Sequence, residues 1–152
     1  MKKQLYFENF AVGEVITSDS YTITKEHALA FAQEYDPQVQ HLDENAASET
    51  LLGQFIVSGW QTAAISMRLK MTSAFAQTPE GIIGMGLEQV RWPRPVFPGD
   101  TLHIEITILE MRLSASRPNR GVAKYQLQTF NQKNELVMEM VTAVLMPRKT
   151  QA

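Results

Sequence analysis

The segment Leu102-His103-Ile104-Glu105-Ile106-Thr107-Ile108 decides the fold class of this chain. Apolar residues occupy every second position of the segment, and polar residues stand between them. Because successive side chains of a strand point to opposite faces, this period of two predicts a strand with one buried face. The strand is therefore expected to be half-buried, with its apolar side against other elements.

More strands are predicted on either side of this segment. Val122 to Phe130 is expected to follow it, and Glu135 to Met146 comes after the turn Asn131-Gln132-Lys133-Asn134. Residues of both parities in the last strand are largely apolar, which is typical of a strand that is central in its sheet or covers an interface. Before the Leu102 strand, the glycine cluster from Gly81 to Gly86 lacks the spacing of a dinucleotide fingerprint, so strand bending is favoured over phosphate binding.

The first half of the chain is predicted to hold an opening strand and then helices. Glu14–Thr17 and Asp19–Thr24 favour the strand, and Thr24 caps a helix from Lys25 to Tyr35. The apolar face of this helix is expected to comprise Ala28, Phe31, Ala32 and Tyr35. After a loop over residues 36–42, Asp43 begins a short helix over residues 45–48.

The longest helix is predicted from Ser58 to Phe75. Its apolar residues at helical spacing are Trp60, Ala63, Ala64, Met67, Met71, Ala74 and Phe75. Core packing is favoured over a cofactor-binding face for this stripe. The order of strand, helices and then consecutive strands indicates one α+β domain over residues 1–152, in which an antiparallel sheet wraps against one long helix.

The composition of the chain argues against several classes of function. The chain has 152 residues, of which 44% are hydrophobic and 20% charged, and its formal net charge is -2. The absence of a basic excess argues against nucleic acid as a partner and against a polybasic membrane anchor. No apolar run reaches the ~20 residues of a membrane-spanning helix. Because cysteine is absent and the N-terminal segment lacks a signal-peptide pattern, we expect a cytoplasmic protein.

Asp36 and His41 are the candidate catalytic pair. They share the segment Asp36-Pro37-Gln38-Val39-Gln40-His41-Leu42-Asp43, which turns at a proline between two helices. A carboxylate and an imidazole brought together in this way can handle a water molecule. On the residues alone, an Asp cap with a surface His stays open as the alternative. His27 and His103 are interpreted as surface histidines, and no metal site is expected.

Four segments carry a family resemblance. They are Tyr6-Phe7-Glu8-Asn9-Phe10-Ala11-Val12-Gly13-Glu14, the segment 36–43 quoted above, Ile56-Val57-Ser58-Gly59-Trp60, and Val90-Arg91-Trp92-Pro93-Arg94-Pro95-Val96-Phe97-Pro98-Gly99-Asp100. In this order they resemble the MaoC-like dehydratases, a hot-dog-fold group that includes the (R)-specific enoyl-CoA hydratases. The resemblance implies a curved antiparallel sheet around one long central helix. It also implies a homodimer or a dimer of dimers, with the active site between subunits.

The resemblance also implies a reaction, which is the reversible syn hydration of a trans-2-enoyl thioester of CoA or acyl carrier protein without a cofactor. Asp36 and His41 would hold the water, and Gly59 would donate its backbone N–H to the thioester carbonyl. An N–H at the start of a helix suits this role because it has no acceptor within the helix.

Departures from the family pattern and alternative functions stay open. Pro37 stands where members often have Asn, and Ser58 where they often have His. Ser58 and Trp60 flank Gly59 and are expected at the substrate. Arg91 and Arg94 are expected either to meet a CoA phosphate or to be surface charges. A hot-dog thioesterase, which would release a thiol, and a non-catalytic acyl-thioester-binding subunit are the alternative functions.

Overall fold

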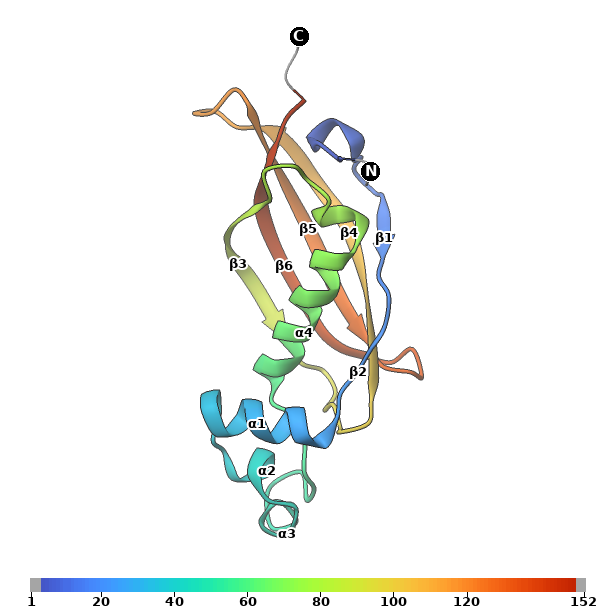
Figure 1. Cartoon of the computed structure of the whole chain (residues 1–152), viewed down its shortest axis with the longest axis vertical. Helices are drawn as coiled ribbons and strands as arrows, with labels where there is room; N and C mark the ends of the chain where they lie inside the picture. The colour runs from blue at the N-terminus through green and yellow to red at the C-terminus, as the bar shows by residue number, and fades with distance from the viewer. Residues whose placement is uncertain (1–3, 150–152) are drawn as a thin grey trace.

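A six-stranded antiparallel sheet runs behind one long helix, α4 (Gly59–Thr72), in the computed structural model, which describes residues 4–149 (Figure 1). The strands are β1 (Val15–Thr17), β2 (Tyr21–Thr22), β3 (Ile83–Arg91), β4 (Thr101–Leu113), β5 (Arg120–Phe130) and β6 (Leu136–Pro147). Their order is β1-β4-β5-β6-β3, and β2 also pairs with β4. The α+β hot-dog architecture expected from the sequence is therefore confirmed.

The remaining elements are short and gather mainly at one end of the sheet (Figure 1). They are α1 (Lys25–Tyr35), α2 (Val39–Leu42), α3 (Glu44–Ala47) and two single-turn 3-10 helices, Phe7–Asn9 and Ala74–Ala76. Within residues 4–149, no helix is both long enough and apolar enough to cross a lipid bilayer.

The strands follow the sequence pattern closely. In β4, Leu102, Ile104, Ile106 and Ile108 are buried, whereas the residues between them are partly exposed. Of the two alternatives for the last strand, a central position or the cover of an interface, the structure shows the central one, because β6 lies between β5 and β3. The single opening strand is wrong, since β1 and β2 are separate. Between them the Ser18 Oγ, rather than a backbone carbonyl, accepts from the Ile104 N–H, which interrupts the ladder.

The first helices differ from the prediction in the packing of Tyr35 and in the extent of helix within residues 36–42. Thr24 caps α1 as predicted, because its side chain accepts from the His27 N–H. Tyr35 is 66% exposed, so it lies outside the buried face that Ala28 and Ala32 form. The expected loop over residues 36–42 contains α2, because the chain is extended only through Gln38 and then resumes helical geometry. Asp43 caps α3 as predicted.

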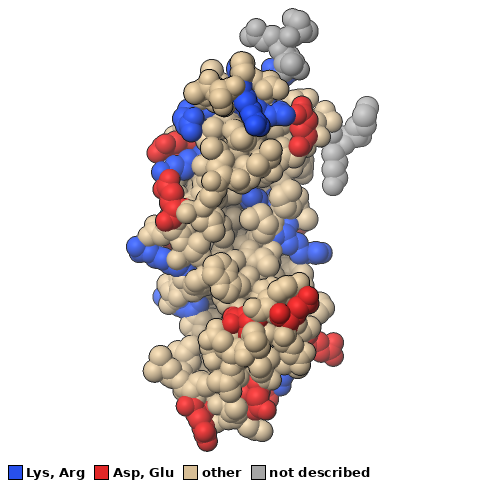
Figure 2. All heavy atoms as spheres, turned by 90° about the vertical axis from the view of Figure 1, so that its left-hand side faces the viewer, with Lys and Arg blue, Asp and Glu red and all other residues tan. Residues whose placement is uncertain are grey.

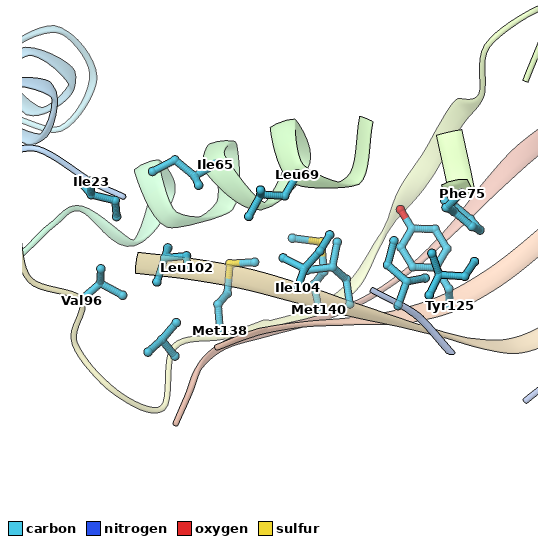
Figure 3. Packing of buried hydrophobic residues seen from close by; sticks show 14 of the residues in the cluster. Ile23, Ile65, Leu69, Phe75, Val96, Leu102, Ile104, Tyr125, Met138 and Met140 are labelled. Atoms are coloured by element: carbon cyan, nitrogen blue, oxygen red, sulfur yellow. The ribbon is translucent and has the colours of Figure 1, made fainter. Parts of the chain in front are cut away.

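The predicted packing of the apolar stripe of the long helix is wrong, because its large residues within α4 are exposed. Trp60 is 57% exposed, Met67 39% and Met71 48%. The face that packs on the sheet instead carries Thr62, Ile65, Ser66, Leu69 and Lys70. Figure 3 shows Ile65 and Leu69 directed from α4 toward the core residues of the sheet. Helix α4 ends at Thr72, and Phe75 reaches the core from the 3-10 turn that follows.

The strand β3 forms an irregular, exposed edge. Its register with β6 shifts between Gly84 and Leu87, and Gly86 has a φ of 133°, a conformation that favours glycine. The predicted bending at the glycine cluster is thus confirmed. Ile83, Met85 and Leu87 are each more than half exposed along this edge, so β3 presents apolar side chains and open backbone groups together.

Candidate active site

Asp36 and His41 meet where α1 ends and α2 runs. Asp36 is the C-cap of α1 and His41 lies in α2, and the His41 Nε2 is 3.4 Å from the Asp36 Oδ2. The two side chains are 6% and 14% exposed, respectively. The structure therefore brings the predicted pair together in a largely buried position, and His41 is not a surface histidine.

The contact of the His41 Nδ1 determines which nitrogen of the ring carries the proton. The His41 Nδ1 lies 2.7 Å from the backbone oxygen of Ile56. A carbonyl oxygen only accepts, so we assign the proton of the neutral ring to Nδ1. The lone pair of Nε2 then faces Asp36 Oδ2, and both atoms are hydrogen-bond acceptors. A water molecule that donates one hydrogen to each of them fits this arrangement.

Two neutral side chains hold the carboxylate of Asp36. Ser58 donates from Oγ to Oδ2 at 2.6 Å, and Gln38 donates from Nε2 to Oδ1 at 2.7 Å. Burial raises the pKa of Asp36, but the hydrogen bonds from Ser58 and Gln38 outweigh it and hold this pKa below its usual value. Asp36 is thus an ionised carboxylate at neutral pH.

Ser58 is not an exposed substrate contact. Its side chain is fully buried and, besides bonding Asp36, accepts at 3.3 Å from the Trp60 N–H as the N-cap of α4. The same hydroxyl therefore begins the central helix and orients the carboxylate.

Gly59 is the first residue of α4, and a side chain at this position would require the indole of Trp92 to move. A Cβ atom built on Gly59 would lie 2.8 Å from the ring of Trp92. The Trp92 Nε1 donates to the Gly59 carbonyl oxygen at 2.9 Å, which keeps the indole against the helix start. The Gly59 N–H has no acceptor within the helix, so it is suited to bind a negative oxygen.

A cavity of about 450 Å³ joins these groups. Of the residues predicted for the site, Asp36, His41, Gly59, Trp60 and Arg94 line it, whereas Ser58 lies behind Asp36. Arg94 is half-exposed and donates to the Leu136 backbone oxygen at 3.3 Å. Arg91 is exposed at the end of β3 and is not among the lining residues, so its position is that of a surface charge.

Trp92 and Thr62 are among the cavity-wall residues that the sequence alone does not single out. Trp92 packs edge-on against Trp60, with ring centroids 5.1 Å apart. Its signal was present, since it stands in the segment 90–100. Thr62 also lines the cavity, and its Oγ1 is buried without a hydrogen-bond partner in the described part of the chain. Residues 4–149 contain no group of three or more His, Cys, Asp or Glu that could hold a metal ion.

Comparison with known proteins identifies the family. Residues 7–130 match the model of the MaoC like domain. The chain is 33% identical over 141 residues to the uncharacterized protein YdeM of Bacillus subtilis, which covers 93% of this chain and 98% of YdeM. The chain therefore belongs to the MaoC-like domain family, as its motifs predict.

Solved structures agree with this assignment. A MaoC-like dehydratase from Rhodospirillum rubrum is 42% identical, with a TM-score of 0.90 over 97% of this chain and 99% of that chain. The (R)-hydratase PhaJ1 from Pseudomonas aeruginosa, at 24% identity, shares the fold with a TM-score of 0.76 over 96% of this chain and 88% of that one.

Proposed function

We propose that the protein is a hydratase or dehydratase that adds water reversibly to a trans-2-enoyl thioester of CoA or acyl carrier protein. The observation that carries this proposal is the convergence of Asp36, His41 and the first residue of α4, Gly59, on one cavity. The similarity to a protein described as a MaoC-like dehydratase supports the same reaction class.

In the hydration direction, Asp36 and His41 hold the water molecule and one of them removes its proton. The water oxygen bonds to C3, the C2–C3 π electrons move toward the carbonyl, and the enolate oxygen accepts a hydrogen bond from the Gly59 N–H. The pair then returns a proton to C2, which completes the addition without a net change in protons. General acid–base help typically contributes about 10²–10⁴ in rate, and one oxyanion donor about 10²–10³.

The other residues position the reactants in this proposal. Ser58 and Gln38 keep the Asp36 carboxylate ionised and oriented. Trp60 and Trp92 form the apolar wall beside the thioester. Arg94 stands at the cavity where a phosphate of the carrier would approach, and its guanidinium is suited to bind one.

The proposed working form is a homodimer. The open edge of β3 and the outward face of α4 both carry exposed apolar side chains, including Leu87 and Met67. An exposed apolar edge strand is a ready template for pairing with another chain. Pairing of two β3 edges would extend the sheet across both copies and cover these side chains.

Two optical assays test the proposed reaction. Loss of the enoyl-thioester ultraviolet absorbance, over a panel of trans-2-enoyl-CoA esters, reports hydration. A colorimetric thiol reagent in parallel samples reports release of CoA. Absorbance loss without thiol supports a hydratase, whereas thiol release at the same rate would replace it with a thioesterase.

A further inference from the structure

The carboxylate of Asp36 lies at the acidic end of the molecule. On the face shown in Figure 2, Asp and Glu side chains prevail at the lower end, which carries the short helices, and most Lys and Arg side chains lie above it. Residues 25–49, which comprise α1, α2 and α3, contain one lysine and six Asp or Glu residues. Within residues 4–149, no Lys or Arg forms an ion pair with Asp36. Neutral hydrogen-bond donors must therefore hold its negative charge.

Two glutamine side chains form a chain of hydrogen bonds that ends on this carboxylate. Gln38 donates from Nε2 to Asp36 Oδ1 at 2.7 Å, and Gln40 donates from Nε2 to Gln38 Oε1 at 2.9 Å. An ionised carboxylate only accepts, so the NH2 group of Gln38 faces Asp36 and its oxygen faces Gln40. This oxygen requires a donor, which assigns the NH2 group of Gln40 to the contact. The orientation of each amide is thus matched to its neighbour.

The backbone of Gln40 is tied to the segment before α4. Its carbonyl oxygen accepts from the Ile56 N–H at 3.0 Å, and the Ile56 carbonyl oxygen is the partner of the His41 Nδ1. Gln38, in contrast, is an exposed residue at the N-cap of α2. A glutamine side chain loses much conformational entropy when it is fixed, and an exposed one can bond to water instead. The bond from Gln40 offsets this cost and retains the Gln38 amide at the carboxylate.

We propose that Gln40 is a positioning residue, because its amide holds Gln38 in the orientation that donates to Asp36. Gln40 thus prepares the carboxylate for the water molecule without contacting it. The catalytic consequence rests on the proposed function, in which Asp36 and His41 hold the water, whereas the fixed amide of Gln38 does not depend on it. Because both glutamines line the cavity, a direct contact between Gln40 and the substrate is the alternative that the test must separate.

Hydrogen exchange of the Gln38 side-chain amide tests the positioning without requiring turnover. Its NMR signals are assigned by their loss in Gln38→Met, and those of Gln33, an exposed residue of α1, by their loss in Gln33→Met. In the unaltered protein, the Gln38 amide is expected to exchange with water at least about fivefold more slowly than that of Gln33. Gln40→Met should bring the two rates together. Gln40→Lys should restore slow exchange, because its ammonium is a donor for the same oxygen.

A double-mutant cycle on the hydration rate tests the catalytic consequence. Gln38→Met is expected to lower kcat by about fivefold and Gln40→Met by about threefold, whereas Gln33→Met leaves it unchanged. Because Gln40 acts through Gln38, the double variant should be no slower than Gln38→Met alone. A further loss in the double variant would overturn the inference, since it would show that Gln40 acts on the substrate or the water directly.

Slow exchange of the Gln38 amide that persists in Gln40→Met would also overturn the inference. If enoyl esters are hydrated but exchange does not respond to Gln40, only the positioning role fails. If exchange responds as expected but no enoyl ester is hydrated, the hydratase proposal fails and the positioning of Gln38 by Gln40 stands.

Discussion

Ser58 Oγ donates a hydrogen bond of 2.6 Å to Asp36 Oδ2, although the two residues are 22 positions apart. This bond joins the N-cap of α4 to the C-cap of α1. The start of the central helix, which supplies the Gly59 N–H, and the carboxylate that faces His41 are thereby held in one unit. The Ser58 bond thus fixes the proposed acid–base carboxylate of Asp36 relative to the proposed oxyanion donor, the Gly59 N–H.

Ser58→Ala is expected to raise the pKa of Asp36, because the variant removes a hydrogen bond to the ionised form. The acid limb of the pH–rate profile should then move to higher pH, and kcat should fall about tenfold or more. Ser116→Ala, in an exposed turn, is the control. An unchanged acid limb in Ser58→Ala would contradict the positioning role.

The same bond predicts how stability depends on pH. Because the pKa of Asp36 is lower in the folded than in the unfolded chain, its ionisation stabilises the fold above the unfolded pKa of about 3.9, and this contribution is lost as pH falls through the folded pKa. Ser58→Ala should therefore lower the free energy of unfolding by about 1–2 kcal/mol at neutral pH and by less in acid. Urea unfolding at both pH values measures the difference.

Gly59→Ala tests the contact with Trp92. The new Cβ would stand 2.8 Å from the indole, so the ring must move and the cavity wall with it. Alanine is otherwise the better helix former, by about 1 kcal/mol, so a loss of activity would not come from a weaker helix. We expect a loss of about tenfold or more in kcat/KM, partly recovered when Trp92→Leu is added. Full activity of the single variant would show that the close approach is unimportant.

Leu87→Glu tests the proposed dimer at the β3 edge, where Leu87 is 53% exposed. Burial of the new carboxylate would cost more free energy than the pairing of two β3 edges contributes, so the dimer should dissociate. Sedimentation should then show half the mass of the unaltered protein. Leu113→Glu places the same charge at an equally exposed position at the end of β4 and should leave the mass unchanged. The same mass for Leu87→Glu and the unaltered dimer would place the interface elsewhere.

Lys70→Met is expected to stabilise the protein without ligand. The folded pKa of about 8 lies below the ordinary value of 10.5, so the buried charge lowers stability below about pH 8, and this penalty fades as pH rises toward the unfolded pKa. The variant should gain about 2 kcal/mol at neutral pH and less near pH 10, as measured by urea unfolding. A less stable variant at neutral pH would show that the hydrogen bond from Lys70 to Tyr125 outweighs the cost of the buried charge.

Much of the fold was predictable because its signals are local. The alternation in β4, the Thr24 cap of α1 and the turn 131–134 each depend on neighbouring residues. The orientation of α4 was not predictable in this way. Apolar residues occur around most of the helix, and the buried face includes polar residues whose partners, Thr129 and Tyr125, come from β5.

In the candidate site, too, the contacts between residues close in the sequence were predictable and those between distant residues were not. Asp36 and His41 are close in sequence, so the short segment between them predicted their meeting. The bond from Ser58 to Asp36 and the indole of Trp92 over Gly59 join residues that only the folded sheet and helix bring together. Ser58 is expected at the substrate because it flanks Gly59 in the sequence, whereas its hydroxyl is buried and bonded to the carboxylate of Asp36.

The most direct test of the central claim is the initial rate of enoyl absorbance loss for the unaltered protein and for Asp36→Asn, with binding of a saturated acyl-CoA to both proteins measured as a control. The account predicts that Asp36→Asn binds the saturated ester normally and loses at least about two orders of magnitude in kcat, because an amide cannot accept the proton of water. His41→Ala should lose as much. Hydration at the full rate by Asp36→Asn would contradict the assignment of the water-binding pair.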